Sequence, residues 1–107
     1  MKKFNTMDLS QKEWSEQLAN DDKAVVLDVR TDEEYEEKHI PNSTQLDIFQ
    51  AQKFMDEVNE FDKSKNYYVY CRSGKRSAQA CQILDQVGVE NTYNLQGGIM
   101  DWEGETN

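Results

Sequence analysis

The 107-residue sequence is poor in the residues that mark linkers, metal sites and disulfide-rich folds. It has one proline and five glycines, so no stretch has the composition of a flexible linker. Its two cysteines and one histidine are too few to complete a four-ligand zinc site without carboxylates. Two cysteines also exclude a fold built on several disulfides. The sequence therefore predicts a single domain over residues 1–107 and no bound metal.

Basic residues and long apolar runs are also scarce. The sequence has 12 Lys and Arg but 21 Asp and Glu, which gives a formal net charge of -9. This charge repels nucleic-acid phosphates and anionic membranes. No apolar run is long enough to cross a bilayer, and the first residues lead into polar ones without the apolar segment of a signal peptide. We therefore expect a cytoplasmic protein that binds neither nucleic acid nor membrane. No exposed apolar stripe stands out, which favours a monomer.

Helix signals and β-prone runs alternate along the chain. Capping-box patterns and apolar residues spaced three or four apart predict helices at about residues 11–20, 32–38, 50–60 and 75–87. Runs rich in Val, Leu, Tyr and Thr predict strands at about residues 23–29, 44–46, 67–70 and 92–95. This alternation is typical of an α/β fold with an open, mainly parallel sheet flanked by helices on both faces. Ligand sites in such sheets lie at the carboxyl ends of the strands.

The most reactive side chain of the sequence lies at such an end. Cys71 directly follows the predicted strand at 67–70, and a glycine-containing loop leads from it into the next helix. Loop amides and a helix N-terminus would converge on the sulfur, and three cations (Arg72, Lys75 and Arg76) fall within five residues. Both effects lower the pKa of a thiol and favour the nucleophilic thiolate. The same loop would hold an anionic substrate or a charged sulfur intermediate.

Three stretches of the sequence resemble the single-domain rhodanese-like sulfurtransferases, and they follow one another in the family's order. The active-site loop of that family is similar to the run from Cys71 to Ser77. Its amino-terminal signature is similar to Leu27–Arg30, followed by Glu34-Tyr35 and His39–Ser43, and its carboxyl-terminal one to Leu95–Ile99 with Trp102. Together these stretches cover a core of about residues 5–104. Asn42-Ser43 stands where the family more often has Gly-Ala, which is a conservative replacement in a turn.

The resemblance implies a rhodanese-like, five-stranded parallel sheet with helices on both faces, and a sulfurtransferase that needs no metal or organic cofactor. Cys71 would take a sulfane sulfur from a small anionic donor such as thiosulfate and form a persulfide. It would then pass the sulfur to cyanide, a small thiol or a protein thiol. The residues implied to bind substrate are Arg72, Ser73, Gly74, Lys75 and Arg76, and Asp28 and Arg30 match chiefly structural positions near the loop.

Other functions remain open beside this one. A sulfur carrier or a non-catalytic binding module could share the fold, although such modules usually lack the nucleophile. A cysteine phosphatase or arsenate reductase is disfavoured, because those enzymes place five residues between cysteine and arginine, whereas four separate Cys71 from Arg76. We interpret Cys81 as a small core residue rather than a resolving partner, since its position along the helix places it far from Cys71. His39, next to Ile40-Pro41, is interpreted as a turn residue rather than a catalytic base.

Overall fold

The computed structural model describes residues 6–107 and contains one five-stranded sheet in the order β1-β5-β4-β2-β3. Every pair of neighbouring strands is parallel. Along the chain the elements are β1 (Thr6–Leu9), α1 (Gln11–Ala19), β2 (Ala24–Asp28), α2 (Asp32–Glu37), β3 (Ser43–Gln45), α3 (Ala51–Asn59), β4 (Asn66–Tyr70), α4 (Lys75–Gln86), β5 (Asn91–Leu95) and the 3-10 helix η1 (Ile99–Asp101). The α/β class and the five-stranded parallel sheet are thus confirmed. Residue 5, at the edge of the expected core, lies outside the described residues.

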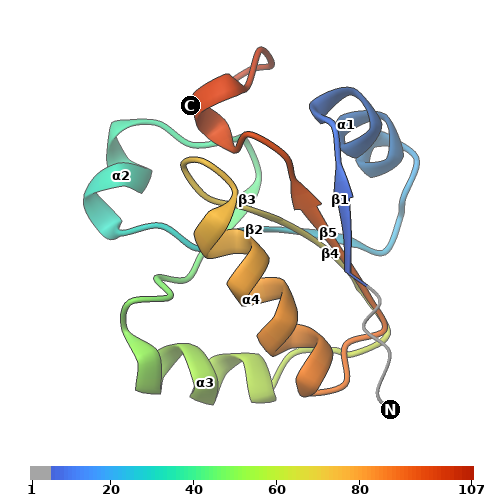
Figure 1. The fold of residues 1–107 in the computed structure, drawn as a ribbon, viewed down its shortest axis with the longest axis vertical. Coiled ribbons are helices and arrows are strands. Elements are labelled where there is room, and N and C mark those ends of the chain that lie inside the picture. Colours follow the sequence, from blue (N-terminus) through green and yellow to red (C-terminus); the bar gives the residue numbers. More distant parts are fainter. Residues whose placement is uncertain (1–5) are drawn as a thin grey trace.

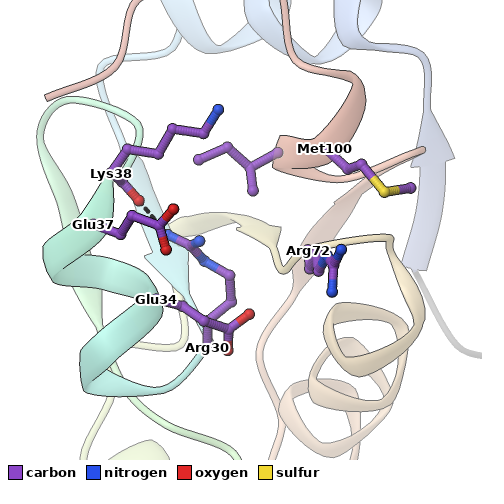
Figure 2. A pocket seen from close by; sticks show the side chains of 7 residues that line it. Arg30, Glu34, Glu37, Lys38, Arg72 and Met100 are labelled. Atoms are coloured by element: carbon purple, nitrogen blue, oxygen red, sulfur yellow. Dashed lines mark hydrogen bonds between the residues drawn. The ribbon is translucent and has the colours of Figure 1, made fainter.

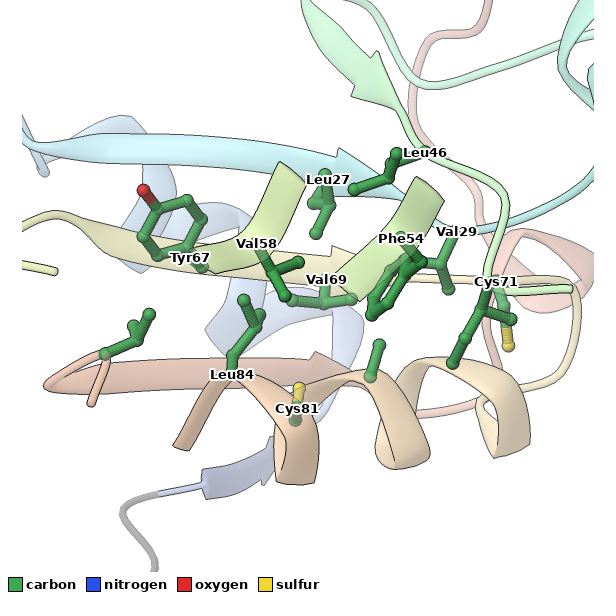
Figure 3. Close-up of a cluster of buried hydrophobic side chains, with 13 residues drawn as sticks. Leu27, Val29, Leu46, Phe54, Val58, Tyr67, Val69, Cys71, Cys81 and Leu84 are labelled. Atoms are coloured by element: carbon green, nitrogen blue, oxygen red, sulfur yellow. The ribbon is translucent and has the colours of Figure 1, made fainter. Parts of the chain in front are cut away.

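The central strands are buried on both faces because apolar or aromatic residues occupy consecutive positions. Along β4, Tyr67 and Val69 belong to one apolar cluster, and Tyr68 and Tyr70 belong to the other. The first cluster fills the space between the sheet and helices α3 and α4, which lie together in Figure 1 and are seen from close by in Figure 3. The second lies under α1, where the Trp14 ring meets Tyr68, Tyr70 and Trp102 edge to face. Helices therefore cover both faces, as predicted.

Both predicted capping boxes are present. The Ser10 hydroxyl accepts from the Glu13 amide at the start of α1, and Thr31 and Glu34 do the same at the start of α2. In the turn before β3, Asn42 has a φ of +66°, a left-handed conformation that asparagine tolerates better than most residues. The helices and strands expected from the sequence pattern are present, with ends displaced by a few residues at most.

The pattern missed two elements, the short 3-10 helix η1 and the first strand. β1 is four residues long and pairs only with β5, at the edge of the sheet. Its exposed Met7 and buried Leu9 alternate only over this short span, which gives little signal. No helix among residues 6–107 is long and apolar enough to cross a bilayer.

The carboxyl ends of β2, β4 and β5 meet at one edge of the sheet. Asp28, Tyr70 and Leu95 end these strands, and the segments that follow β4 and β5 are hydrogen-bonded to each other. Cys71 is the first residue after β4, so the fold places it where open parallel sheets bind ligands.

Candidate active site

Hydrogen-bond donors from the start of α4 surround the Cys71 sulfur. Gly74 is the N-cap residue of α4, and its φ of +105° lets the chain turn sharply from the strand into the helix. The Gly74 amide donates to Sγ at 3.1 Å and the Ser77 hydroxyl donates at 3.4 Å. The backbone amides of Ser73 and Ser77 also contribute to lowering the pKa of this thiol. We call these four donors, from Ser73, Gly74 and Ser77, the sulfur cradle.

The hydrogen bonds of the sulfur cradle change the pKa of the Cys71 thiol by more than burial does. Cys71 is only 1% exposed, and burial by itself raises the pKa of a thiol. The hydrogen bonds from the Ser77 side chain and from the three amides lower it by more, so the pKa of Cys71 lies below its usual value of 9.0. The pKa of Cys71 is therefore lowered, as predicted from the loop amides and the helix N-terminus.

The segment after β5 holds the backbone of Cys71 and Arg72 in place. The Ile99 amide donates to the Cys71 carbonyl at 2.9 Å, and the Met100 amide donates to the Arg72 carbonyl at 3.0 Å. Gly98 makes this approach possible, since a Cβ there would lie 2.6 Å from the Cys71 carbonyl oxygen. Its φ of 60° and ψ of -163° also belong to a region that only glycine adopts readily.

The three cations of the loop have different surroundings. Arg72 and Lys75 are exposed at the mouth of the loop. Arg76 instead makes two hydrogen bonds to the Glu34 carboxylate, at 2.8 and 2.9 Å, and its guanidinium stacks on Phe49. The Arg76 bonds lower the pKa of Glu34 to about 2. The fold thus uses Arg76 to join α4 to α2, a link across 42 residues that the sequence pattern did not reveal.

A second ion pair, between Asp28 and Arg30, lies beside the loop and is buried. The Arg30 guanidinium donates to Asp28 at 2.7 Å and to the Lys38 carbonyl at 2.8 Å, and it stacks on the Tyr70 ring. These contacts join the end of β2 to the end of α2. The structure therefore gives Asp28 and Arg30 the structural contacts that the resemblance implied.

A cavity of about 420 Å³ opens between α2, the Cys71 loop and η1 (Figure 2). We call it the loop pocket. The residues that line it are Arg30, Glu34, Glu37, Lys38, Arg72, Ile99 and Met100. Of the residues that the resemblance assigned to substrate binding, only Arg72 is among them. Glu37, Lys38 and Met100 gave no sequence signal, because they are exposed residues outside the matching stretches.

Cys81 and His39 have the surroundings expected of structural residues. Cys81 is fully buried in the first apolar cluster, where burial raises its pKa to about 12, and both cysteines are free thiols. The His39 ring stacks on Tyr35 and its Nδ1 lies 2.8 Å from the Tyr35 carbonyl, which makes Nδ1 the donor.

Across the part of the chain that the structure covers, no group of three His, Cys, Asp or Glu side chains could hold a metal ion.

The fold and the site together define a class of α/β proteins with a parallel sheet and a buried thiol held by loop amides at the carboxyl end of a central strand. Comparison with known proteins identifies the family within that class: a family model described as a rhodanese-like domain matches residues 11–105. The chain belongs to this rhodanese-like family, as the sequence resemblance indicated.

Named relatives agree with this assignment. The putative sulfurtransferase YtwF of Bacillus subtilis is 40% identical over 91 residues, which are 85% of this chain and 84% of YtwF. The thiosulfate sulfurtransferase GlpE of Coxiella burnetii is 35% identical over 79 residues, which are 74% of this chain and 71% of GlpE. A crystal structure of a rhodanese-like domain protein from Staphylococcus aureus superposes with a TM-score of 0.77 at 31% identity, covering 92% of each chain. The chain thus belongs to a family several of whose members are named sulfurtransferases.

Proposed function

We propose that this protein is a sulfurtransferase in which Cys71 carries a sulfane sulfur as a persulfide. One observation carries the proposal: a buried thiol whose pKa is nevertheless lowered, because the sulfur cradle donates several hydrogen bonds to it. Such an arrangement stabilises negative charge on sulfur, and a persulfide carries the same charge one atom further out.

Thiosulfate is the donor that we propose for the first step. The Cys71 thiolate attacks the outer sulfur of thiosulfate, a new S–S bond forms, and sulfite leaves with the electron pair of the bond that breaks. Arg72 and Lys75, exposed at the mouth of the loop, attract the dianion to an otherwise acidic protein. The name of the relative GlpE supports this choice of donor.

The second step transfers the sulfur to a nucleophilic acceptor, such as cyanide or a thiol. The acceptor attacks the outer sulfur of the persulfide, the bond to Cys71 breaks, and its electron pair returns to the Cys71 sulfur. The sulfur cradle then stabilises the departing thiolate, just as it held the attacking one. Both steps balance without a metal or an organic cofactor.

Phosphatase chemistry receives less support from the same geometry. A phosphatase needs its arginine side chain aimed at the oxyanion beside the cysteine. In this protein the guanidinium of Arg76 is held by Glu34 and covered by Phe49. The loop is also one residue shorter than the phosphatase loop, which favours a single sulfur atom as its cargo.

Intact-protein mass spectrometry tests the proposal. Reduced protein incubated with thiosulfate should gain the mass of one sulfur atom, and cyanide should remove it. Cys71→Ser should gain nothing, whereas the matched control Cys81→Ala should still gain one sulfur. Sulfur addition to Cys71→Ser, or its absence from the wild type, would contradict the mechanism.

A further inference from the structure

We propose that Asn94 is a positioning residue for the sulfur chemistry of Cys71. Its side-chain amide holds the carbonyl group of Gly74 from β5, and this contact directs the Gly74 N–H at the Cys71 sulfur. The inference rests on the proposed function, because the sulfur that Gly74 bonds is the one that would attack the donor.

Gly74 depends on other residues to fix the direction of its N–H. As a glycine with a φ of +105°, it rotates about its backbone bonds more freely than any other residue, and it has no side chain to anchor it. Its N–H nevertheless lies 3.1 Å from the Cys71 sulfur. A Cβ at Gly74 would lie 3.5 Å from the Leu95 carbonyl oxygen and 3.6 Å from the Gly97 nitrogen, so the residue packs against the end of β5. β5 is therefore the element from which Gly74 can be held.

Asn94 makes this contact from the buried face of β5. It pairs with Val69 of β4 and Asp8 of β1, so the three side chains lie on the face of the sheet that α3 and α4 cover. Asn94 is only 4% exposed. Its Nδ2 donates to the Gly74 carbonyl oxygen at 3.2 Å and to the Asp8 carboxylate at 2.8 Å. One amide group thus joins β1 and β5 to the start of α4.

The hydrogen bonds of Asn94 indicate that this position requires a donor. Both of its partners are acceptors, so the amide has to be oriented with Nδ2 toward them. This orientation leaves Oδ1 buried and without a hydrogen-bond partner among residues 6–107. An unpaired buried acceptor lowers stability, and a leucine of similar shape would avoid that loss. Asparagine therefore suits the direction of Gly74 better than the stabilisation of the fold.

Loss of the Asn94 amide would leave neither partner unpaired. The Gly74 carbonyl also accepts from the Ala78 amide at 3.1 Å, and Asp8 is exposed to solvent. A variant that lacks the Asn94 amide is therefore expected to fold. It loses the contact that holds Gly74 from the side of the sheet, so the Gly74 N–H is free to turn away from the sulfur.

Asn94→Leu tests the inference without any sulfur donor. The midpoint of the pH dependence of Cys71 alkylation should rise by about one unit, since one hydrogen bond to the thiolate is weakened. The midpoint of urea unfolding should not fall, because the substitution removes a buried acceptor that has no partner in the described chain.

Asn91→Leu is the matched control for this change. Asn91 also lies on β5, but its amide donates to Asn66 at 3.1 Å, at the end of the strand away from the loop. The Cys71 midpoint should be the same in this variant as in the wild type. An unchanged midpoint in Asn94→Leu, or an equal shift in Asn91→Leu, would overturn the inference.

Nuclear magnetic resonance follows the Gly74 N–H directly. In the wild type the Gly74 amide proton should move downfield as Cys71 ionises, because it donates to the charged sulfur. In Asn94→Leu this movement should fall to less than about half, and the same is expected of Asn94→Ala, which adds no bulk beside α4. The control Asn91→Leu should keep it. A full downfield movement in both Asn94 variants would overturn the inference.

Sulfur transfer from thiosulfate separates this inference from the proposed function. At a pH below both alkylation midpoints, kcat/KM of Asn94→Leu should be about tenfold lower than that of the wild type, and above both midpoints the two should agree. Equal values at the lower pH would overturn the role of Asn94 and leave the persulfide mechanism intact. A wild type that never gains sulfur, together with a raised Cys71 midpoint in Asn94→Leu, would overturn the proposed function instead.

Discussion

The two cysteines of this protein lie ten residues apart, and both are almost completely buried against the same apolar cluster. Their acidities nevertheless move in opposite directions. The pKa of Cys71 lies below 9.0, whereas that of Cys81 rises to about 12. Figure 3 shows Cys81 facing the apolar space between α4 and the sheet, with Cys71 at the far end beside the loop.

The difference shows that burial alone does not decide whether a thiol ionises. Burial raises the pKa at both sites, because a charged sulfur loses its hydration. At Cys71 the first amides of α4 have no partner within the helix and are free to donate to sulfur. At Cys81, two turns further along, the helix amides bond the helix itself. Reactivity therefore depends on whether a cysteine faces the unpaired amides at the start of α4, as Cys71 does, or lies within the helix, as Cys81 does.

The largest expected effect is a difference in reactivity between the two thiols. At pH 8 a pKa of about 12 leaves Cys81 with a thiolate fraction on the order of 10⁻⁴. We expect iodoacetamide to modify Cys71 at least about a thousandfold faster than Cys81, as measured by peptide mapping at timed intervals. In guanidinium the two rates should become equal, which is the control. If iodoacetamide modified both cysteines of the folded protein at comparable rates, the predicted difference in their pKa values would be wrong.

Gly98→Ala changes a residue of the segment after β5 and should disturb the Cys71 loop that packs against this segment. The new Cβ would collide with the carbonyl groups of Cys71 and Arg72, at a backbone conformation that alanine avoids. We expect a loss of about 3 kcal/mol in the free energy of unfolding, measured by urea denaturation, and a rise in the pKa of Cys71.

Gly88→Ala is the matched control for this change. Gly88 also has a positive φ, of +103°, but a Cβ there would meet only the Lys63 side chain at ordinary contact distance. This variant should lose about 1 kcal/mol and leave Cys71 unchanged. An equal effect of both variants on the Cys71 pKa would mean that Gly98 acts through general stability rather than through the loop.

Ser77→Ala isolates one donor of the sulfur cradle. The Ser77 hydroxyl is buried and donates to Sγ at 3.4 Å, and it is the strongest of the groups that lower the Cys71 pKa. We expect that pKa to rise by about one unit, measured from the pH dependence of alkylation. Ser15→Ala, which removes a hydroxyl bonded to the Gln11 carbonyl of α1, should not move it. An unchanged Cys71 pKa in Ser77→Ala would assign the acidity to the amides alone.

Local sequence signals were sufficient for the part of the site that lies within one stretch of chain. The cysteine after a β-prone run, the glycine in the loop and the helix that follows predicted the position and acidity of Cys71. Both capping boxes formed as expected, since they depend on residues three apart. The role of the Ser77 hydroxyl was missed, although a serine in the first turn of the helix after the cysteine loop is a signal that could have revealed it.

Contacts between distant stretches could not be predicted in this way. The sheet order brings α2 beside α4, and only then does Arg76 meet Glu34. The loop pocket depends on the same placement, because α2 and η1 form its opposite walls. Periodicity reports which face of an element is buried, but not which element covers it.

Glu34→Gln gives the smallest expected effect and separates charge from hydrogen bonding as the cause of the Cys71 acidity. The bonds to Arg76 lower the pKa of Glu34 from 4.5 to about 2, so this carboxylate stabilises the folded state above pH 4.5 and loses that contribution as the pH falls toward 2. Because the pair is partly exposed, we expect the wild type to be more stable than the variant by only about 1 kcal/mol at pH 7. The difference should vanish near pH 2 in urea denaturation experiments.

The Glu34→Gln variant also tests what sets the pKa values of Cys71 and Cys81. Arg76 without its carboxylate partner keeps its positive charge near the loop, yet it is not one of the donors to the Cys71 sulfur. We therefore expect the Cys71 pKa to move less in Glu34→Gln than in Ser77→Ala, and the Cys81 pKa not to move. Glu36→Gln, on the exposed face of α2, should leave both the stability profile and the thiols unchanged. If Glu34→Gln instead shifted Cys71 as far as Ser77→Ala does, the balance of charge around Arg76, and not the sulfur cradle, would be what distinguishes Cys71 from Cys81.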